Sequence, residues 1–327
     1  MVVYIRRQKS EDRSQKSDFS VFCRLSSILL LISVFCLLPD LAYAWGPATH
    51  LDLSLTVLAN LSWALPGISA LLRKYPDEFI YGSVSPDIIM GKKYAGYMYH
   101  CHNWSVGSLI LNEAETDAQR AAAYGYLTHL AADSVAHNYF VPYKMIRSYS
   151  TRSLSHTYWE VRFDLDVPEE IWKVVPKVIQ HDYHEFDYLL ERVLKKTLFS
   201  FRTNKKIFNS ILILQKLKQL RRTLKIYAKA SRWVLSEKDR ENYRRLALES
   251  VRDFLENGER AKCCLVDPAG LRKITYAVNL RRRLKSLVRK KVITVAQAET
   301  LVCRVKEGLQ KSIFDSEGVL PDVQDIL

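Results

Sequence analysis

The stretch from Thr116 to Ala136 constrains the fold of this chain more than any other. It is rich in Ala, Leu and Tyr and contains no proline, which is typical of a long, largely buried α-helix. His129, Asp133 and His137 follow one another at intervals of four residues, so a helix would place the three side chains on one face. Burying two imidazoles and a carboxylate among apolar residues is costly unless they have a partner. We interpret the triplet as metal ligands, because zinc accepts imidazole and carboxylate groups in proteins.

Helical periodicity dominates the rest of the chain as well. Alternating strand patterns are scarce, and prolines such as Pro66 and Pro142 mark breaks between helical stretches. Thr49 is a candidate N-cap for a helix that begins near Leu51. Glycine and proline are few, which excludes a disordered or low-complexity chain. We therefore predict an all-α fold, a multi-helix bundle, with helical stretches at 51–72, 116–136, 158–165, 172–198, 211–235, 237–255, 271–292 and 294–313.

The first 44 residues have the layout of a signal peptide. An uncharged apolar run from Leu25 to Pro39 follows a basic, polar segment and is too short to span a bilayer comfortably. The sequence Ala42-Tyr43-Ala44 then forms a cleavage site, and cutting there would leave Trp45 as the first residue. We predict an exported protein, secreted or periplasmic, with residues 1–44 removed. A retained N-terminal anchor is the alternative.

Two candidate elements lie on either side of the predicted helix. His156 and Glu160 are four residues apart, which again places both on one helix face. Asp87 follows Ser85-Pro86 in a predicted loop, and His100 and His102 come shortly after it. Alternate residues of an extended segment point in opposite directions, so we expect only one of these two histidines to be a ligand.

The predicted mature N-terminus is the fourth element. A free amine at Trp45, together with the carbonyl of the same residue, could chelate a metal in a five-membered ring. His50 follows close behind, at the predicted start of a helix. The position of the cleavage site directly before Trp45 would then serve metal binding.

These four elements, in this order, resemble the zinc-dependent phospholipase C family, whose relatives include the fungal single-strand nucleases. The similarity covers Trp45 to Asp166. It implies a phospholipase C-like helical domain that binds up to three Zn²⁺, with Asp87 also acting as a general base. The implied ligand sets are Trp45 and His50 for one zinc, Asp87, His129 and His102 or His100 for a second, Asp133 as a bridge between these two, and His137, His156 and Glu160 for the third.

Two details of the motifs favour a lipid-active branch of the family. Only three residues separate Asp133 from His137, a shorter gap than in the bacterial phospholipases, and this resembles the phospholipase D that cleaves glycosylphosphatidylinositol anchors. The closing motif ends in Glu160, as in the phospholipases, where the nucleases usually have Asp. We therefore expect a zinc-dependent hydrolase of phosphodiester bonds in phospholipids. The alternatives are a single-strand nuclease and a non-catalytic, zinc-stabilised protein that binds membranes.

The net charge of +14 is concentrated in the C-terminal part of the chain. Residues 45–195 contain 13 Lys and Arg against 17 Asp and Glu, whereas residues 196–327 contain 30 against 14. We predict a catalytic domain at 45–195 and a basic helical region at 196–327. This region would hold anionic lipid through 281–283 and 289–291, or nucleic acid in the nuclease alternative. No protein partner is predicted.

Overall fold

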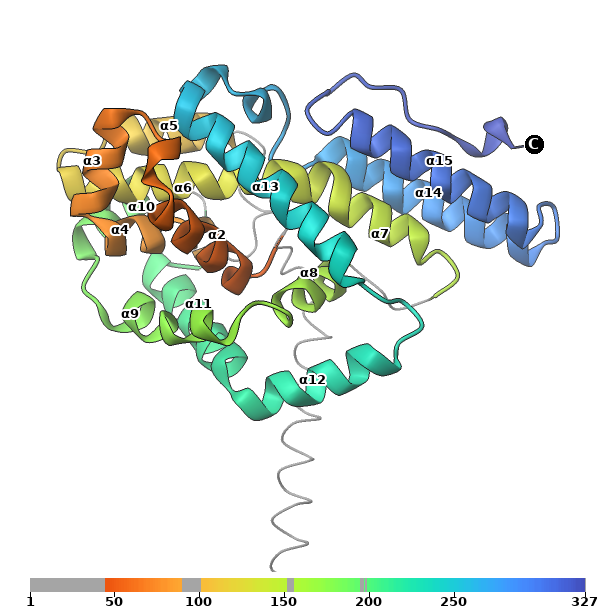
Figure 1. The fold of residues 1–327 in the computed structure, drawn as a ribbon, viewed down its shortest axis with the longest axis horizontal. Coiled ribbons are helices and arrows are strands. Elements are labelled where there is room, and N and C mark those ends of the chain that lie inside the picture. The colour runs from red at the N-terminus through yellow and green to blue at the C-terminus, as the bar shows by residue number, and fades with distance from the viewer. Residues whose placement is uncertain (1–44, 90–100, 152–155, 195–196, 198, 327) are drawn as a thin grey trace, which may run out of the picture. The chain divides into compact units, whose positions relative to one another are not determined.

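A computed structural model describes residues 45–89, 101–151, 156–194, 197 and 199–326. The regular elements of these residues are all helices, which confirms the all-α prediction (Figure 1). Residues 42–327 form one compact unit. None of the described helices is long and apolar enough to cross a membrane. The longer helices are α2 (Pro47–Ala59), α3 (Pro66–Lys74), α4 (Pro76–Gly82), α5 (Trp104–Asn112), α6 (Asp117–Val135), α7 (Val141–Arg147), α8 (His156–Asp164), α9 (Val175–Gln180), α10 (His184–Val193), α11 (Phe201–Lys216), α12 (Lys218–Ala230), α13 (Glu237–Asn257), α14 (Leu271–Arg289) and α15 (Val295–Lys311).

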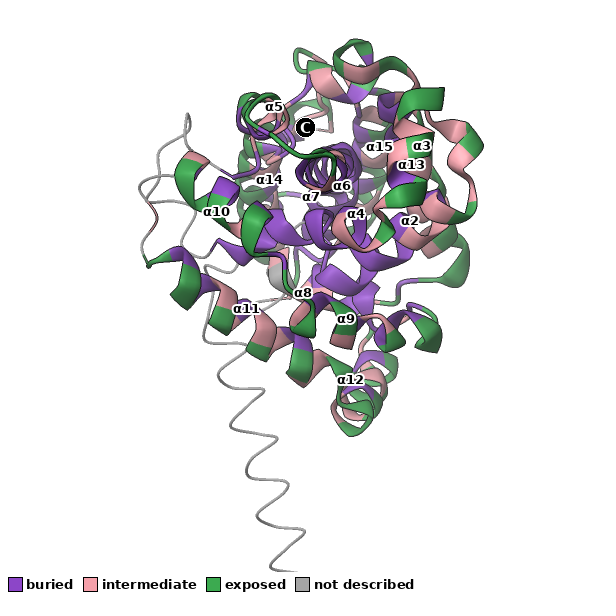
Figure 2. Cartoon of the chain, turned by 90° about the vertical axis from the view of Figure 1, so that its left-hand side faces the viewer, coloured by how far each residue is buried: buried purple, intermediate pink, exposed green. Residues whose placement is uncertain are grey.

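Helix α6 is buried along nearly its whole length, as the sequence predicts. Its side chains are apolar or small on every face, so other helices can pack all round it. Helices α4, α5 and α13 do so (Figures 1 and 2). The helix begins with a capping box, in which the side chains of Thr116 and Gln119 each accept a hydrogen bond from the other's backbone N–H. The helix is therefore a rigid support for the polar residues near its C-terminal end.

The helix does not stop at α6 but widens into a π-helical turn, η5 (Ala136–Phe140), and continues as α7. Pro142 in the first turn of α7 explains the change. A proline has no N–H, and its ring clashes with the carbonyl four residues earlier in a regular α-helix. The wider turn accommodates the proline. His137 lies at the start of this turn, and its Nδ1 is 3.8 Å from Oδ2 of Asp133, one helical turn earlier, so the wider turn does not separate it from the face of Asp133.

The C-terminal helices pack directly on this central helix. Helix α13 contacts α6 and α2, whereas α14 contacts η5 and α7, and α15 contacts α7. The predicted domain boundary between residues 195 and 196 therefore lies within one compact unit and stays a prediction. Three predicted helical stretches are interrupted, and the first of them, 51–72, is divided among α2, the 3-10 helix η1 (Leu61–Trp63) and α3. Residues 172–198 contain the end of the 3-10 helix η6 (Glu169–Lys173), α9 and α10, and residues 211–235 are divided between α11 and α12.

Candidate metal centre

Asp133 lies at the middle of a cluster of histidines. Its Oδ1 is 3.2 Å from Nε2 of His50, which comes from α2. Its Oδ2 is 3.2 Å from Nε2 of His102 and 3.2 Å from Nε2 of His129, which lies one turn earlier on α6. All four side chains are almost completely inaccessible to solvent. One carboxylate thus touches histidines from three separate segments of the chain.

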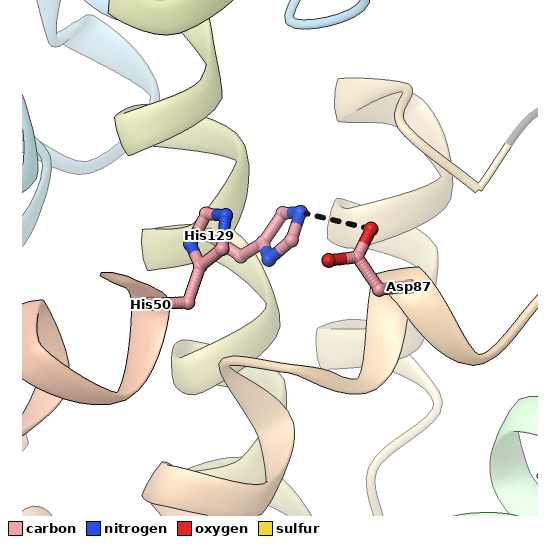
Figure 3. Close-up of side chains that lie close together, drawn as sticks. All are labelled: His50, Asp87 and His129. Atoms are coloured by element: carbon pink, nitrogen blue, oxygen red, sulfur yellow. Dashed lines mark ion pairs between the residues drawn. The ribbon is translucent and has the colours of Figure 1, made fainter. Parts of the chain in front are cut away.

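Asp87 adds a second carboxylate to this cluster. It lies in the 3-10 helix η2 (Ser85–Ile88), where we had predicted a loop, and is fully buried. Its Oδ1 is 3.4 Å from Nε2 of His102 and 3.9 Å from Nε2 of His129. Figure 3 shows Asp87 facing His129, with His50 on the other side of that ring. The rings of His50 and His129 stack with their centroids 3.7 Å apart.

A third group of candidate ligands combines η5 with α8. Nε2 of His156 lies 2.8 Å from Oε1 of Glu160, one turn later on the same helix. The ring of His137 is 5.1 Å from that of His156, measured between centroids. The side chain of His156 is 17% exposed, whereas the side chain of Glu160 is 2% exposed. Among the candidate ligands that the structure describes, His156 therefore lies nearest to solvent.

These side chains form three groups, in each of which every residue offers one ligand atom and these atoms lie within 4.8 Å of one another. The third group is the set predicted from the sequence. The other two regroup the residues assigned to the first and second zinc ions, since His129 belongs to both of them. His102 reaches the cluster, whereas His100 lies outside the described residues, so the choice between these two histidines stays a prediction. The groups are His50, Asp87 and His129; His102, His129 and Asp133; and His137, His156 and Glu160.

The buried polar atoms of the cluster fit a cation. Nε2 of His50 and both carboxylate oxygens of Asp133 have no hydrogen-bond partner within the described part of the chain. Burial lowers the pKa of His129 to about 4 and that of His137 to about 3, so both imidazoles are neutral and keep a lone pair for a metal. Burial opposes ionisation of Asp133, but the surrounding histidines hold its pKa well below the usual range. A carboxylate among neutral imidazoles is a donor set that suits zinc.

Backbone carbonyls orient two of the histidines. Nδ1 of His129 is 2.8 Å from the carbonyl oxygen of Ser83, and Nδ1 of His137 is 2.6 Å from that of Pro268. In each case Nδ1 donates its proton to the carbonyl, which leaves Nε2 deprotonated and able to bind a cation. Because Pro268 precedes α14, the C-terminal region supplies part of the metal centre's surroundings.

Trp45 is fully buried beside the cluster. Its ring packs against Phe163 and Phe140, with centroid distances of 5.3 and 6.3 Å. Asp164 fixes the backbone that follows, because its carboxylate accepts hydrogen bonds from the N–H of Ala48 and from the N–H and hydroxyl of Thr49. A side chain at position 46 would collide with this carboxylate, since a Cβ on that glycine would lie 2.0 Å from Oδ2 of Asp164.

The N-terminal contacts correct one prediction and reveal one residue that we had missed. Thr49 is not the N-cap of its helix. Helix α2 begins at Pro47 with Gly46 as its cap, and Thr49 lies inside it. Asp164 was not predicted, although it follows Glu160 by four residues and so extends the spacing from His156 along one face of α8. No comparable signal exists for backbone carbonyls, because any residue type can supply one.

Comparison with known proteins agrees with this geometry. Residues 49–202 match the family described as zinc dependent phospholipase C. The matched segment contains all of the described candidate ligands except Trp45. No curated protein and no solved structure matches the chain.

Proposed function

Because residues 49–202 of this chain belong to the zinc-dependent phospholipase C family, we propose that the protein hydrolyses phosphodiester bonds in phospholipids. One observation supports this most directly, namely the three groups of histidines and carboxylates that could each hold a metal ion. Water would add to phosphorus, the bond between phosphorus and the glycerol oxygen would break, and the phosphorylated headgroup would leave. The glycerol oxygen would take up a proton, so that a diacylglycerol is the second product.

The residues of the chain would prepare the site for this reaction. Asp133 would bridge two zinc ions, and His137, His156 and Glu160 would hold a third. When bound, zinc polarises phosphate oxygens and lowers the pKa of a coordinated water toward neutrality. We propose that Asp87, which is buried against His102 and His129, accepts the proton of the attacking water as a general base. The carbonyls of Ser83 and Pro268 would keep the imidazoles in the tautomer that the ions require.

Substrate hydrolysis with zinc-loaded and chelator-treated protein tests the proposal. We expect zinc-loaded protein to release phosphorylated headgroup from phosphatidylcholine vesicles. Removal of the metal should abolish the release, and added zinc should restore it. Single-stranded DNA serves as the competing substrate. Cleavage of DNA without hydrolysis of phospholipid would identify a nuclease, and bound zinc without either reaction would identify a non-catalytic zinc protein.

We also propose that the protein is exported and cut after Ala44. Trp45 is buried, and the N–H of His50 donates to the carbonyl of the next residue, Gly46, which supports a role for a free N-terminal amine as a zinc ligand. A variant with one extra alanine before Trp45 should lose the zinc of the His50 group and most of its activity, while the zinc at His137, His156 and Glu160 should remain. Zinc measured per chain in the two forms checks this. Equal zinc content would show that the amine is not a ligand.

The basic C-terminal region is proposed to hold anionic phospholipid near the site. Its two predicted Arg and Lys runs differ in the structure. In the first, Arg281 donates to the carbonyl of Thr151 and Arg283 pairs with Asp322, so both already have partners within the protein. In the second, Arg289 and Lys290 are exposed at the C-terminal end of α14. The first run is therefore less suited to bind a lipid headgroup than the sequence suggested.

A further inference from the structure

Helices α11 and α12 belong to a stretch of the chain in which every charged residue is Lys or Arg. Residues 199–236 include ten Lys and Arg and no Asp or Glu. The segment is almost entirely outside the part of the chain that matches the phospholipase family, which ends at residue 202. Its charge therefore calls for an explanation separate from the metal centre.

Most of this charge is exposed and has no partner within the described part of the chain. Lys205 pairs with Asp187, and Arg221 is buried against Glu169 and the ring of Trp172. These two residues attach the helix pair to the rest of the protein. Six other basic residues are exposed and make no ion pair with any described residue, namely Arg202, Lys206, Lys216, Lys218, Arg222 and Lys229.

Large apolar side chains are exposed among these basic residues. On α12, Ile226 is 69% exposed and Tyr227 is 62% exposed. Ile226 follows Arg222 by four residues and precedes Lys229 by three, so the three side chains share one face of the helix. On α11, Ile213 precedes Lys216 by three residues, so these two side chains also share one face, and Ile213 is half exposed. Leu217, between the two helices, and Val234, after them, are also exposed. Figure 2 shows both helices largely as exposed and intermediate residues.

The C-terminal end of α12 leads to the most accessible part of the metal centre. Ser231 contacts the hydroxyl of Tyr158, which lies two residues after His156. Nε1 of Trp233 donates to the hydroxyl of Thr151, 2.6 Å away, on the other side of His156 in the sequence. The segment after α12 thus holds both flanks of the least buried ligand.

We propose that the exposed face of α11 and α12 docks the protein on an anionic phospholipid bilayer. A basic helix face with isolated aliphatic and aromatic side chains is typical of helices that lie in the membrane interface, where charge attracts the headgroups and the apolar side chains enter the acyl boundary. Exposed aliphatic side chains contribute little to binding a phosphate backbone, so a bilayer fits this face better than a nucleic acid. The docking face belongs to the proposed function, because it would bring phospholipid to the side of the metal centre at which His156 is accessible.

Vesicle binding of the zinc-loaded protein that begins at Trp45 tests the docking face. Sedimentation with phosphatidylglycerol–phosphatidylcholine vesicles should bind the protein, whereas vesicles of phosphatidylcholine alone should bind it much less. The double variant Lys218→Glu/Arg222→Glu should weaken binding at least about 10-fold, since each basic residue near an anionic surface contributes measurably. The matched control is Arg260→Glu/Lys262→Glu, which changes the charge equally at two exposed positions after α13 and should change binding less than about 3-fold.

A second variant distinguishes a bilayer from a nucleic acid. Ile226→Ser/Tyr227→Ser should weaken vesicle binding but leave any binding to single-stranded DNA unchanged. The proposed docking face would be wrong if both charge-reversal variants lost vesicle binding equally. It would also be wrong if the charge reversals weakened binding to DNA but not to vesicles. The docking variants should still hydrolyse a short-chain phosphatidylcholine dissolved as monomers at the normal rate. If no form hydrolyses any phospholipid but the variants still lose vesicle binding, the proposed function fails and the docking face stands.

Discussion

Replacing Asp133 by Asn is expected to remove the zinc of two ligand groups at once and to reduce phosphodiester hydrolysis at least about 100-fold, because metal ions contribute several kcal/mol to such transition states. The carboxylate oxygens of Asp133 lie 3.2 Å from His50, His102 and His129. An amide offers one oxygen in place of two and carries no charge. Its NH₂ group would face imidazole nitrogens that should bind a cation. Zinc per chain, measured after dialysis, and the rate of headgroup release check this expectation.

The same variant should keep the zinc of the third group. Nδ1 of His137 is 2.6 Å from the carbonyl oxygen of Pro268 but 3.8 Å from Oδ2 of Asp133, so the carbonyl chiefly sets its orientation, and Glu160 pairs with His156. Asp117→Asn is a suitable control, because Asp117 lies on the same helix but is exposed at its first turn. Normal zinc content and activity in the Asp133 variant would contradict the assignment of Asp133 as the bridging ligand.

Replacing Gly270 by Ala should weaken both the fold and the metal centre, although this position is far from the candidate ligands in sequence. Gly270 has φ of 58°, in the left-handed region that side chains disfavour. A Cβ here would lie 2.4 Å from the carbonyl oxygen and 2.6 Å from the Cβ of His137. Either the loop or His137 must then move, which breaks the hydrogen bond to Pro268. Loss of such a second-shell partner typically costs about 10–100-fold in metal affinity.

A second glycine provides a matched control for this variant. Gly258 has the same φ of 58°, but no atom lies within 4 Å of the position that a Cβ would occupy. Gly258→Ala therefore tests backbone strain without a clash, although its ψ of −133° lies outside the left-handed helical region of Gly270 and makes its strain at least as large. We expect both substitutions to lower the free energy of unfolding in urea, by about 1–3 kcal/mol for the strained backbone. Zinc affinity, measured by chelator competition, should fall only in the Gly270 variant. Equal effects of the two substitutions on zinc affinity would show that the contact with His137 is unimportant.

The sequence predicted the fold class and which segments would supply the candidate ligands, because helical spacing is a strong signal. The start of α6 at Thr116 and the shared face of His156 and Glu160 both follow from it. Local spacing was less reliable where the chain departs from a regular helix. The π turn before Pro142 does not follow from the spacing of the ligands, and Thr49 lies inside a helix that begins two residues earlier.

Other parts of the centre depend on tertiary contacts that no local pattern encodes. The carbonyls of Ser83 and Pro268 orient histidines through atoms that every residue possesses. The grouping of His129 with both Asp87 and Asp133 likewise follows from how η2 packs on α6. Asp164 is different, since its spacing from Glu160 is visible in the sequence, although its contacts with Ala48 and Thr49 are not.

The hydrogen bond between His137 and Pro268 joins residues 131 positions apart, and this separation sets an order of events for a newly made chain. Helix α6 depends on local contacts and can form early, whereas closing so long a loop is slow. Until the chain has been synthesised past Gly270, the imidazole of His137 has no carbonyl to select its tautomer. A ribosome-bound chain that has passed the last candidate ligand but not yet this loop would hold zinc weakly, so maturation of the metal centre should be among the last steps of folding.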